Sequence, residues 1–238
     1  MGTAWQQVIC ESAMTFIDDI RLNEQMATNS AAFFRRMSLY MKLAIPMLNR
    51  PPELLTFLKN GITVPTYDDA EWVSTEESTQ GETAVDTGKT GYSVFSCVLQ
   101  TTYDQGVIQT AYSEASYDPE TGIVTFPQQA AAGAVYLMDF YQDGEFSREL
   151  TDRQIRLLGL ACACVWDDRF SNEWLSNHAK IHDASFDVPN EANYMTATTR
   201  KRNENRMLFN GELKKYEQDV QYRQAVSPGI RSQTMSFL

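Results

Sequence analysis

The feature that most constrains this chain is a long, strongly charged helix predicted over residues 190–222. Its apolar positions form one narrow seam, with steps of four, three and four residues between Phe209, Leu213, Tyr216 and Val220. An isolated helix is marginally stable and gains most of its stability by packing an apolar face, so this seam needs a partner surface. Two alternatives follow: the helix lies on its own domain, or it is a docking arm of an assembled particle. The extended tail predicted after the helix, to Leu238, needs a partner as well.

The composition supports a folded protein with a hydrophobic core. The chain has 238 residues, of which 43% are hydrophobic and 11% aromatic, enough for one large domain or two small ones. No apolar run approaches the ~20 residues of a membrane-spanning helix. Residues 1–10 lack a basic segment followed by an apolar run, so we expect no secretory signal and an intracellular site of synthesis.

The charge is distributed unevenly. Residues 190–238 carry eight basic and five acidic side chains, a net charge of +3. Since the whole chain has a net charge of −11, residues 1–189 have a net charge of −14. A negative total disfavours nucleic-acid binding by the whole surface. An acidic body with a mildly basic arm suits contacts between copies of the chain or with an acidic protein.

The N-terminal region, residues 1–62, is predicted to be helical. Apolar residues at helical spacing indicate one helix over residues 8–22 and a second from Ser30 to Pro46, which should kink or end it. A short helix follows Pro51 and ends near Asn60-Gly61. Residues 63–90 are rich in Asp, Glu, Ser and Thr and are predicted to be an exposed acidic loop.

A small antiparallel β element is predicted over residues 91–147. Its strands cover residues 92–100, 107–112, 123–126 and 134–141, with a strong turn signal at residues 118–122.

The region 148–189 is predicted to contain a central helix and an extended link to the arm. Thr151 and Gln154 form a capping-box pattern, and apolar residues continue at helical spacing to about Ile181. The predicted fold is therefore α+β. It is mainly helical, with an inserted antiparallel sheet and a C-terminal arm and tail over residues 190–238.

No motif for catalysis, metal binding or cofactor binding is complete in this sequence. Residues 83–90 nearly match a phosphate-binding loop but lack its first glycine and the strand-to-helix context. His178 and His182 lie four residues apart, with no third histidine and no HExxH motif. The adjacent acidic pairs, such as Asp167-Asp168, are interpreted as solvated surface. We therefore expect no enzyme, no cofactor and no metal.

The cysteines and tryptophans are assigned structural roles, with one alternative left open. Cys10, Cys97, Cys162 and Cys164 are expected to be small buried residues in a reducing compartment. Trp166 and Trp174 are expected in the core. Trp5 and Trp72 lie in terminal or polar segments and are either structural or interface anchors.

The order of these regions resembles the head–tail connector (neck adaptor) proteins of tailed bacteriophages. Several stretches carry the resemblance: 136–146 (YLMDFYQDGEF), 150–154 (LTDRQ), 166–170 (WDDRF), 197–206 (ATTRKRNENR) and 211–218 (GELKKYEQ). The resemblance covers most of residues 15–222 and rests on the general character of these stretches and on their order along the chain. The inserted β element departs from the smallest, all-helical adaptors.

The resemblance implies a structural virion protein of the neck, made in the host bacterial cytoplasm. It would form a ring with copies of itself, commonly twelve-fold, joining the portal protein to other neck or tail proteins and lining the DNA channel without sequence-specific binding or membrane contact. Residues 226–238 would then order only on docking. The expected partner-contact residues are Trp72, Phe209, Leu213, Tyr216, Val220, Arg231, Phe237 and Leu238. The alternatives are another neck or tail component, such as a stopper or tail-completion protein, or a nucleic-acid-binding regulatory module outside the virion.

Overall fold

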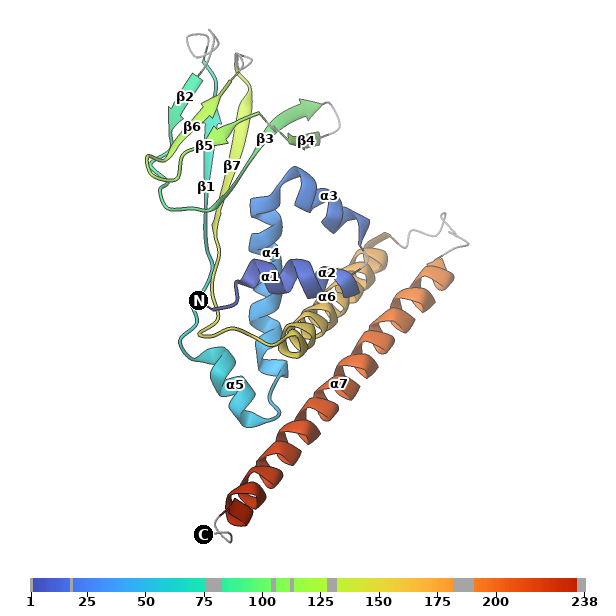
Figure 1. Ribbon diagram of the computed structural model, residues 1–238. Coiled ribbons are helices and arrows are strands. Elements are labelled where there is room, and N and C mark those ends of the chain that lie inside the picture. The colour runs from blue at the N-terminus through green and yellow to red at the C-terminus, as the bar shows by residue number, and fades with distance from the viewer. Residues whose placement is uncertain are drawn as a thin grey trace.

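The computed structural model describes residues 2–17, 19–75, 83–103, 106–111, 114–127, 132–181 and 191–234. The fold is α+β, with a helical body, a β module at one end of it and a long C-terminal helix along its side (Figure 1). The helical elements are α1 Trp5–Val8, η1 Ile9–Ala13, α2 Met14–Phe16, α3 Ile20–Thr28, α4 Ser30–Ala44, η2 Ile45–Met47, α5 Pro52–Lys59, α6 Asp152–Ile181 and α7 Glu191–Thr234.

The first predicted helix is divided into two parts. A π-helical turn, η1, interrupts the segment from Trp5 to Phe16, and the chain is extended at Ile17 before α3 begins. Asp19 caps α3, because its carboxylate accepts a hydrogen bond from the Arg21 N–H at 2.9 Å. The predicted helix over residues 8–22 was therefore right in type but missed this break.

Helix α4 lies at the centre of the molecule, and its prediction is confirmed. The Asn29 side chain caps its start by accepting from the Ala32 N–H at 3.0 Å, and Pro46 lies in the short 3-10 turn η2 that follows. The helix also contacts the β module. Phe34 stacks on Tyr141, and the Ser38 and Tyr141 hydroxyls are hydrogen-bonded at 2.8 Å. Helical body and sheet are thus packed together through α4.

The β module consists of two antiparallel sheets that enclose a second apolar cluster. One sheet has the order β1-β7-β3-β4 and the other β2-β6-β5. The cluster includes Phe126, Tyr136, Met138 and Phe140. The strands are β1 Thr66–Val73, β2 Thr83–Asp86, β3 Val94–Tyr103, β4 Gly106–Ala111, β5 Ser116–Tyr117, β6 Ile123–Phe126 and β7 Val135–Gln142.

The prediction of an acidic loop over residues 63–90 was wrong, because this region contains β1 and β2. Strand β1 pairs with β7 along its whole length, from Thr66 opposite Gln142 to Val73 opposite Val135. Its side chains alternate between the two faces. Ala70 and Trp72 pack on the apolar cluster, while Asp69 and Glu71 are exposed. The density of carboxylates concealed this two-residue period. The four predicted strands correspond to β3, β4, β6 and β7, and β5 was missed together with β1 and β2.

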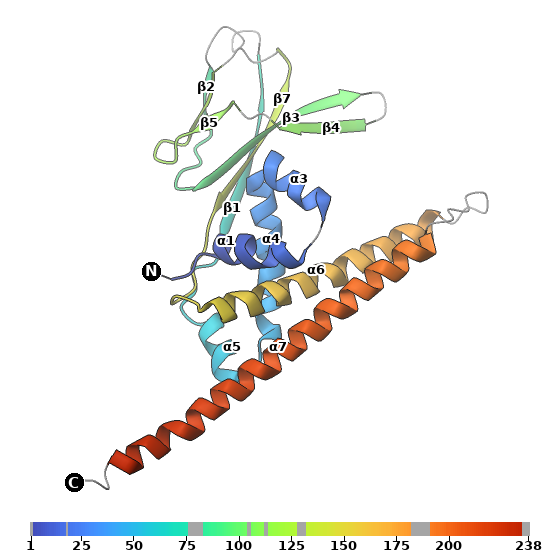
Figure 2. The ribbon, with the colours of Figure 1, turned by 45° about the vertical axis from the view of Figure 1, so that its right-hand side comes forward.

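Helices α6 and α7 form an antiparallel pair along one side of the body (Figure 2). The capping box of α6 is confirmed: Gln154 Oε1 accepts from the Thr151 N–H at 3.0 Å, and Thr151 Oγ1 accepts from the Gln154 N–H at 3.4 Å. Helix α7 contains 44 residues and is about 66 Å long. It continues through Pro228 and Gly229 to Thr234, so the extended tail predicted for residues 223–234 was wrong. A proline costs one backbone hydrogen bond but does not necessarily end a helix.

Candidate interaction surfaces

The apolar seam of α7 packs on its own domain. Phe209 and Leu213 belong to the main hydrophobic core, with 4% and 9% of their surface exposed. Tyr216 packs against the same core, and its hydroxyl accepts a hydrogen bond from Gln154 Nε2 at 2.9 Å. Val220 is half-buried farther along the helix. The structure therefore corrects the expectation for Phe209 and Leu213, which are packing residues and not contacts to another protein.

Polar contacts from α6 hold the first half of α7. The Asp168 carboxylate accepts from Arg202 Nε at 2.7 Å and from Arg206 Nη2 at 2.6 Å. Its neighbour Asp167 accepts from Asn205 Nδ2 at 2.8 Å. Burial raises the pKa of Asp167 despite this hydrogen bond, because desolvation penalises the charged carboxylate. The Asp167-Asp168 pair, interpreted from sequence as solvated surface, instead attaches the arm to the body.

These contacts reduce the cationic character of the arm. Arg202 and Arg206 are engaged by Asp168 of α6. Within α7, Arg200 pairs with Glu204 and Lys215 with Glu212. Four of the eight basic residues that made the arm a candidate for binding an acidic partner, Arg200, Arg202, Arg206 and Lys215, thus form ion pairs inside the molecule.

The outer side of α7 keeps several exposed apolar residues. Met207 and Tyr222 expose 74% and 71% of their surface, and Leu208 and Val226 are also exposed. Gln224 Nε2 donates to the Glu53 carboxylate of α5 at 3.3 and 3.4 Å, and beyond that point the helix extends away from the other helices (Figure 2). This outer side and the projecting end are the parts of α7 that remain open to a partner.

The charge of the chain is concentrated in the β module. Residues 66–142 contain twelve acidic residues and a single base, Lys89, a net charge of −11. The other residues contain nineteen acidic and nineteen basic side chains and are neutral in sum. The molecule therefore has an anionic β end and a balanced helical body, a sharper division than the acidic body and basic arm expected from the sequence.

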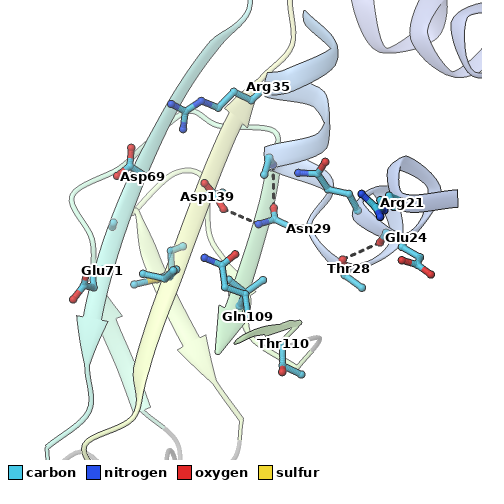
Figure 3. Close-up of a pocket in the computed structure, with 16 residues that line it drawn as sticks. Arg21, Glu24, Thr28, Asn29, Arg35, Asp69, Glu71, Gln109, Thr110 and Asp139 are labelled. Atoms are coloured by element: carbon cyan, nitrogen blue, oxygen red, sulfur yellow. Dashed lines mark hydrogen bonds between the residues drawn. The ribbon is translucent and has the colours of Figure 1, made fainter. Parts of the chain in front are cut away.

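An open groove of about 850 Å³ lies between the β1-β7-β3-β4 sheet and the helices α3 and α4 (Figure 3). Asp139 lies at its centre and accepts from Asn29 Nδ2 at 2.7 Å. The Arg35 guanidinium lies 4.1 Å from the Tyr67 ring centroid. The charged residues that line the groove are Arg21, Glu24, Arg35, Asp69, Glu71 and Asp139. The groove is polar and mixed in charge, which suits a peptide or protein surface better than an apolar small molecule.

The remaining expected contact residues have different positions. Trp72 stacks on Phe126 and Tyr136 at ring-centroid distances of 5.1 and 5.5 Å, so it is a packing residue of the β module. Trp5 is fully buried and stacks on Phe146, which makes it structural as well. Arg231 lies in the helical backbone of α7, but its side chain is not among those described. Phe237 and Leu238 lie outside the described residues.

The residues considered for phosphate or metal binding have other contacts or do not converge in the part of the chain that the structure describes. Lys89 forms an ion pair with Asp68 at 2.6 Å, and β3 follows where a phosphate-binding loop would need a helix. In the described ranges, no three His, Cys, Asp or Glu side chains converge as metal ligands. The His178 side chain, together with His182, is outside the described part.

Three of the four cysteines are buried as expected. Burial raises the pKa of Cys97, Cys162 and Cys164 to about 12, so these thiols are protonated at neutral pH. Cys10 is exposed, contrary to the expectation.

Comparison with protein-family models, with curated proteins and with solved structures found no match for this chain. Among the described residues, no helix is long and apolar enough to cross a membrane.

Proposed function

We propose that this chain is a structural assembly protein, a head–tail adaptor that forms a ring with copies of itself in the neck of a tailed bacteriophage. The observation that carries the proposal is α7, a 44-residue helix whose described side chains pack on the body along part of one face, with an open outer side and a projecting end. A helix of this length exceeds what its own small domain can cover, and this suits a subunit whose surface is completed by neighbours.

The division of charge also supports this assignment. A module with a net charge of −11 repels phosphates, so it can lie near a DNA channel without retaining the genome. The neutral helical body can pack against identical copies without strong mutual repulsion. The same features fit a stopper or tail-completion protein, which remains the nearest alternative.

A regulatory nucleic-acid-binding module has less support. It would rely on the basic residues of α7, but Arg202 and Arg206 are committed to Asp168 at 2.7 and 2.6 Å. Such a module would show DNA affinity that falls steeply with salt concentration. Absence of DNA binding at low salt would eliminate it.

The test of the proposed function is quantitative mass spectrometry of purified phage particles. We expect this chain at about a dozen copies per particle, beside the portal protein, because a closed ring has a fixed stoichiometry. A phage in which the chain ends at Ser227 should produce soluble, folded subunits but no infectious particles. Infectious particles built from the truncated chain, or absence of the chain from wild-type particles, would contradict the proposal.

A further inference from the structure

The two edges of the four-stranded sheet are protected very differently. Edge strand β1 carries Asp68, Asp69 and Glu71, and the Lys89–Asp68 ion pair lies across it. Edge strand β4 has the sequence GVIQTA, with no charged residue and no proline, and Ile108 on it exposes 55% of its surface. Charges on an edge strand discourage pairing with another chain, whereas a neutral, β-branched edge invites it.

The outer edge of β4 is open within the part of the chain that the structure describes. Its inner edge pairs with β3, from Val98 opposite Ala111 to Tyr103 opposite Gly106, and no described strand continues the sheet beyond it. The β3–β4 hairpin extends to the side of the module, where an extended chain could approach (Figure 2). Gln109 and Thr110 also line the groove, so the strand edge and the groove form one continuous surface.

The surrounding charge indicates which occupant this edge accepts. The module that carries β4 has a net charge of −11, so a second copy of the same edge would bring two strongly anionic modules together. Nucleic acid is repelled for the same reason. The groove is lined by four carboxylates, Glu24, Asp69, Glu71 and Asp139, and by two arginines, Arg21 and Arg35, so its lining is also negative in sum. The favoured occupant is therefore a different polypeptide with positive charge.

We propose that β4 is a docking edge for an extended, cationic segment of a partner protein, which adds a strand to the sheet. Backbone hydrogen bonds along the β4 edge would supply affinity, and the negative charge of the module would favour lysine or arginine in the added strand. This contact depends on the sheet edge alone and does not require that the chain forms a ring.

The test measures binding of labelled peptides to the full chain by fluorescence anisotropy. The first probe is an alternating valine–threonine peptide with two lysines at each end, and the second has glutamates in place of the lysines. We expect the lysine peptide to bind and the glutamate peptide to bind about tenfold more weakly or not at all. In hydrogen exchange, the lysine peptide should protect amides of β4 and leave those of β1 unchanged.

Two matched variants place the contact on the edge of β4. Ile108→Lys introduces a charge on the open edge and should weaken binding of the lysine peptide by about tenfold or more. Val73→Lys adds the same charge at an exposed position of β1, where 48% of the residue surface is exposed, and should change binding less than about twofold. Ile108→Thr keeps a neutral β-branched residue and should retain binding.

Three outcomes would overturn the proposal. The first is absence of binding by either peptide up to about 1 mM. The second is equal binding of the lysine and glutamate peptides, which would remove the charge selection. The third is concentration-dependent self-association of the wild type, measured by sedimentation velocity, that Ile108→Lys abolishes. That result would show that β4 contacts another copy of this chain.

Discussion

At the scale of single residues, Gly159 determines how closely α6 approaches the N-terminal segment. A Cβ atom at this position would clash with the Ser12 side chain and lie 2.8 Å from the Ala13 nitrogen. The Ser12 hydroxyl donates to the Arg156 carbonyl oxygen at 3.5 Å across the same contact. Glycine is therefore required by close packing between two helical segments, although it lowers the intrinsic stability of α6.

Replacing this glycine should destabilise the protein. Gly159→Ala should lower the free energy of unfolding by about 1–3 kcal/mol, because the added methyl overpacks the contact with η1. Urea denaturation followed by circular dichroism measures this change. The control is Gly211→Ala in α7, where a Cβ meets nothing within 4 Å, and it should be neutral or stabilise by up to about 1 kcal/mol. Equal effects of the two substitutions would contradict the packing argument.

At the scale of elements, the middle of α7 is attached to the body and its outer side is not. Phe209 and Leu213 are buried in the main core, and the carboxylates of Asp167 and Asp168 bind side chains one to two turns before Phe209. Exposed Met207 lies on the same helix two residues from Phe209. The helix is therefore stabilised by a seam on one side, as expected of a polar helix with few apolar positions.

Truncating the seam should release α7 from α6. Phe209→Ala should cost about 3–5 kcal/mol in the free energy of unfolding and increase hydrogen exchange of the α7 amides, because it opens a cavity in the core. Met207→Ala should change stability by less than about 0.5 kcal/mol, since 74% of that residue is exposed. A Phe209→Ala variant with wild-type stability and exchange would show that the seam does not hold the arm.

At the scale of the whole molecule, the separation of charge has a thermodynamic consequence. The β module concentrates twelve carboxylates with one base, so its acidic groups repel one another. Mobile ions shorten the range of this repulsion. The helical body has no net charge, so its charged groups do not add a net repulsion of this kind.

Added salt should therefore stabilise the protein. Raising NaCl from about 20 mM to about 300 mM should increase Tm by ~2–4 °C, the equivalent of about 1 kcal/mol for a chain of this size. In a Glu114→Gln, Glu120→Gln variant, which removes two exposed charges of the module, Tm at low salt should be higher and the salt-dependent rise smaller. Differential scanning calorimetry measures both values. A Tm that is independent of salt in the wild type would contradict this view.

Elements whose residues repeat with a clear period or carry local signals could be predicted before the fold was known. The capping box at Thr151 and Gln154 predicted the start of α6, and helical spacing predicted α4. Helical spacing also predicted the α7 seam, and apolar runs bounded by turn signals predicted β3, β6 and β7. These features depend on neighbours within a few residues, so they are readable without the fold.

The surface that each element meets could not be predicted from such local patterns and became clear from the folded chain. The seam of Phe209 and Leu213 could have been covered by α6 or by another copy of the chain. A helical period shows that one face is apolar, but it does not show which surface covers that face. Strand β1 resembled a loop until its pairing with β7 placed Trp72 inside and Asp69 and Glu71 outside. The open edge of β4 is likewise a property of strand order. Contacts between residues far apart in the sequence are set by the packing of the whole chain, and for that reason local patterns leave them open.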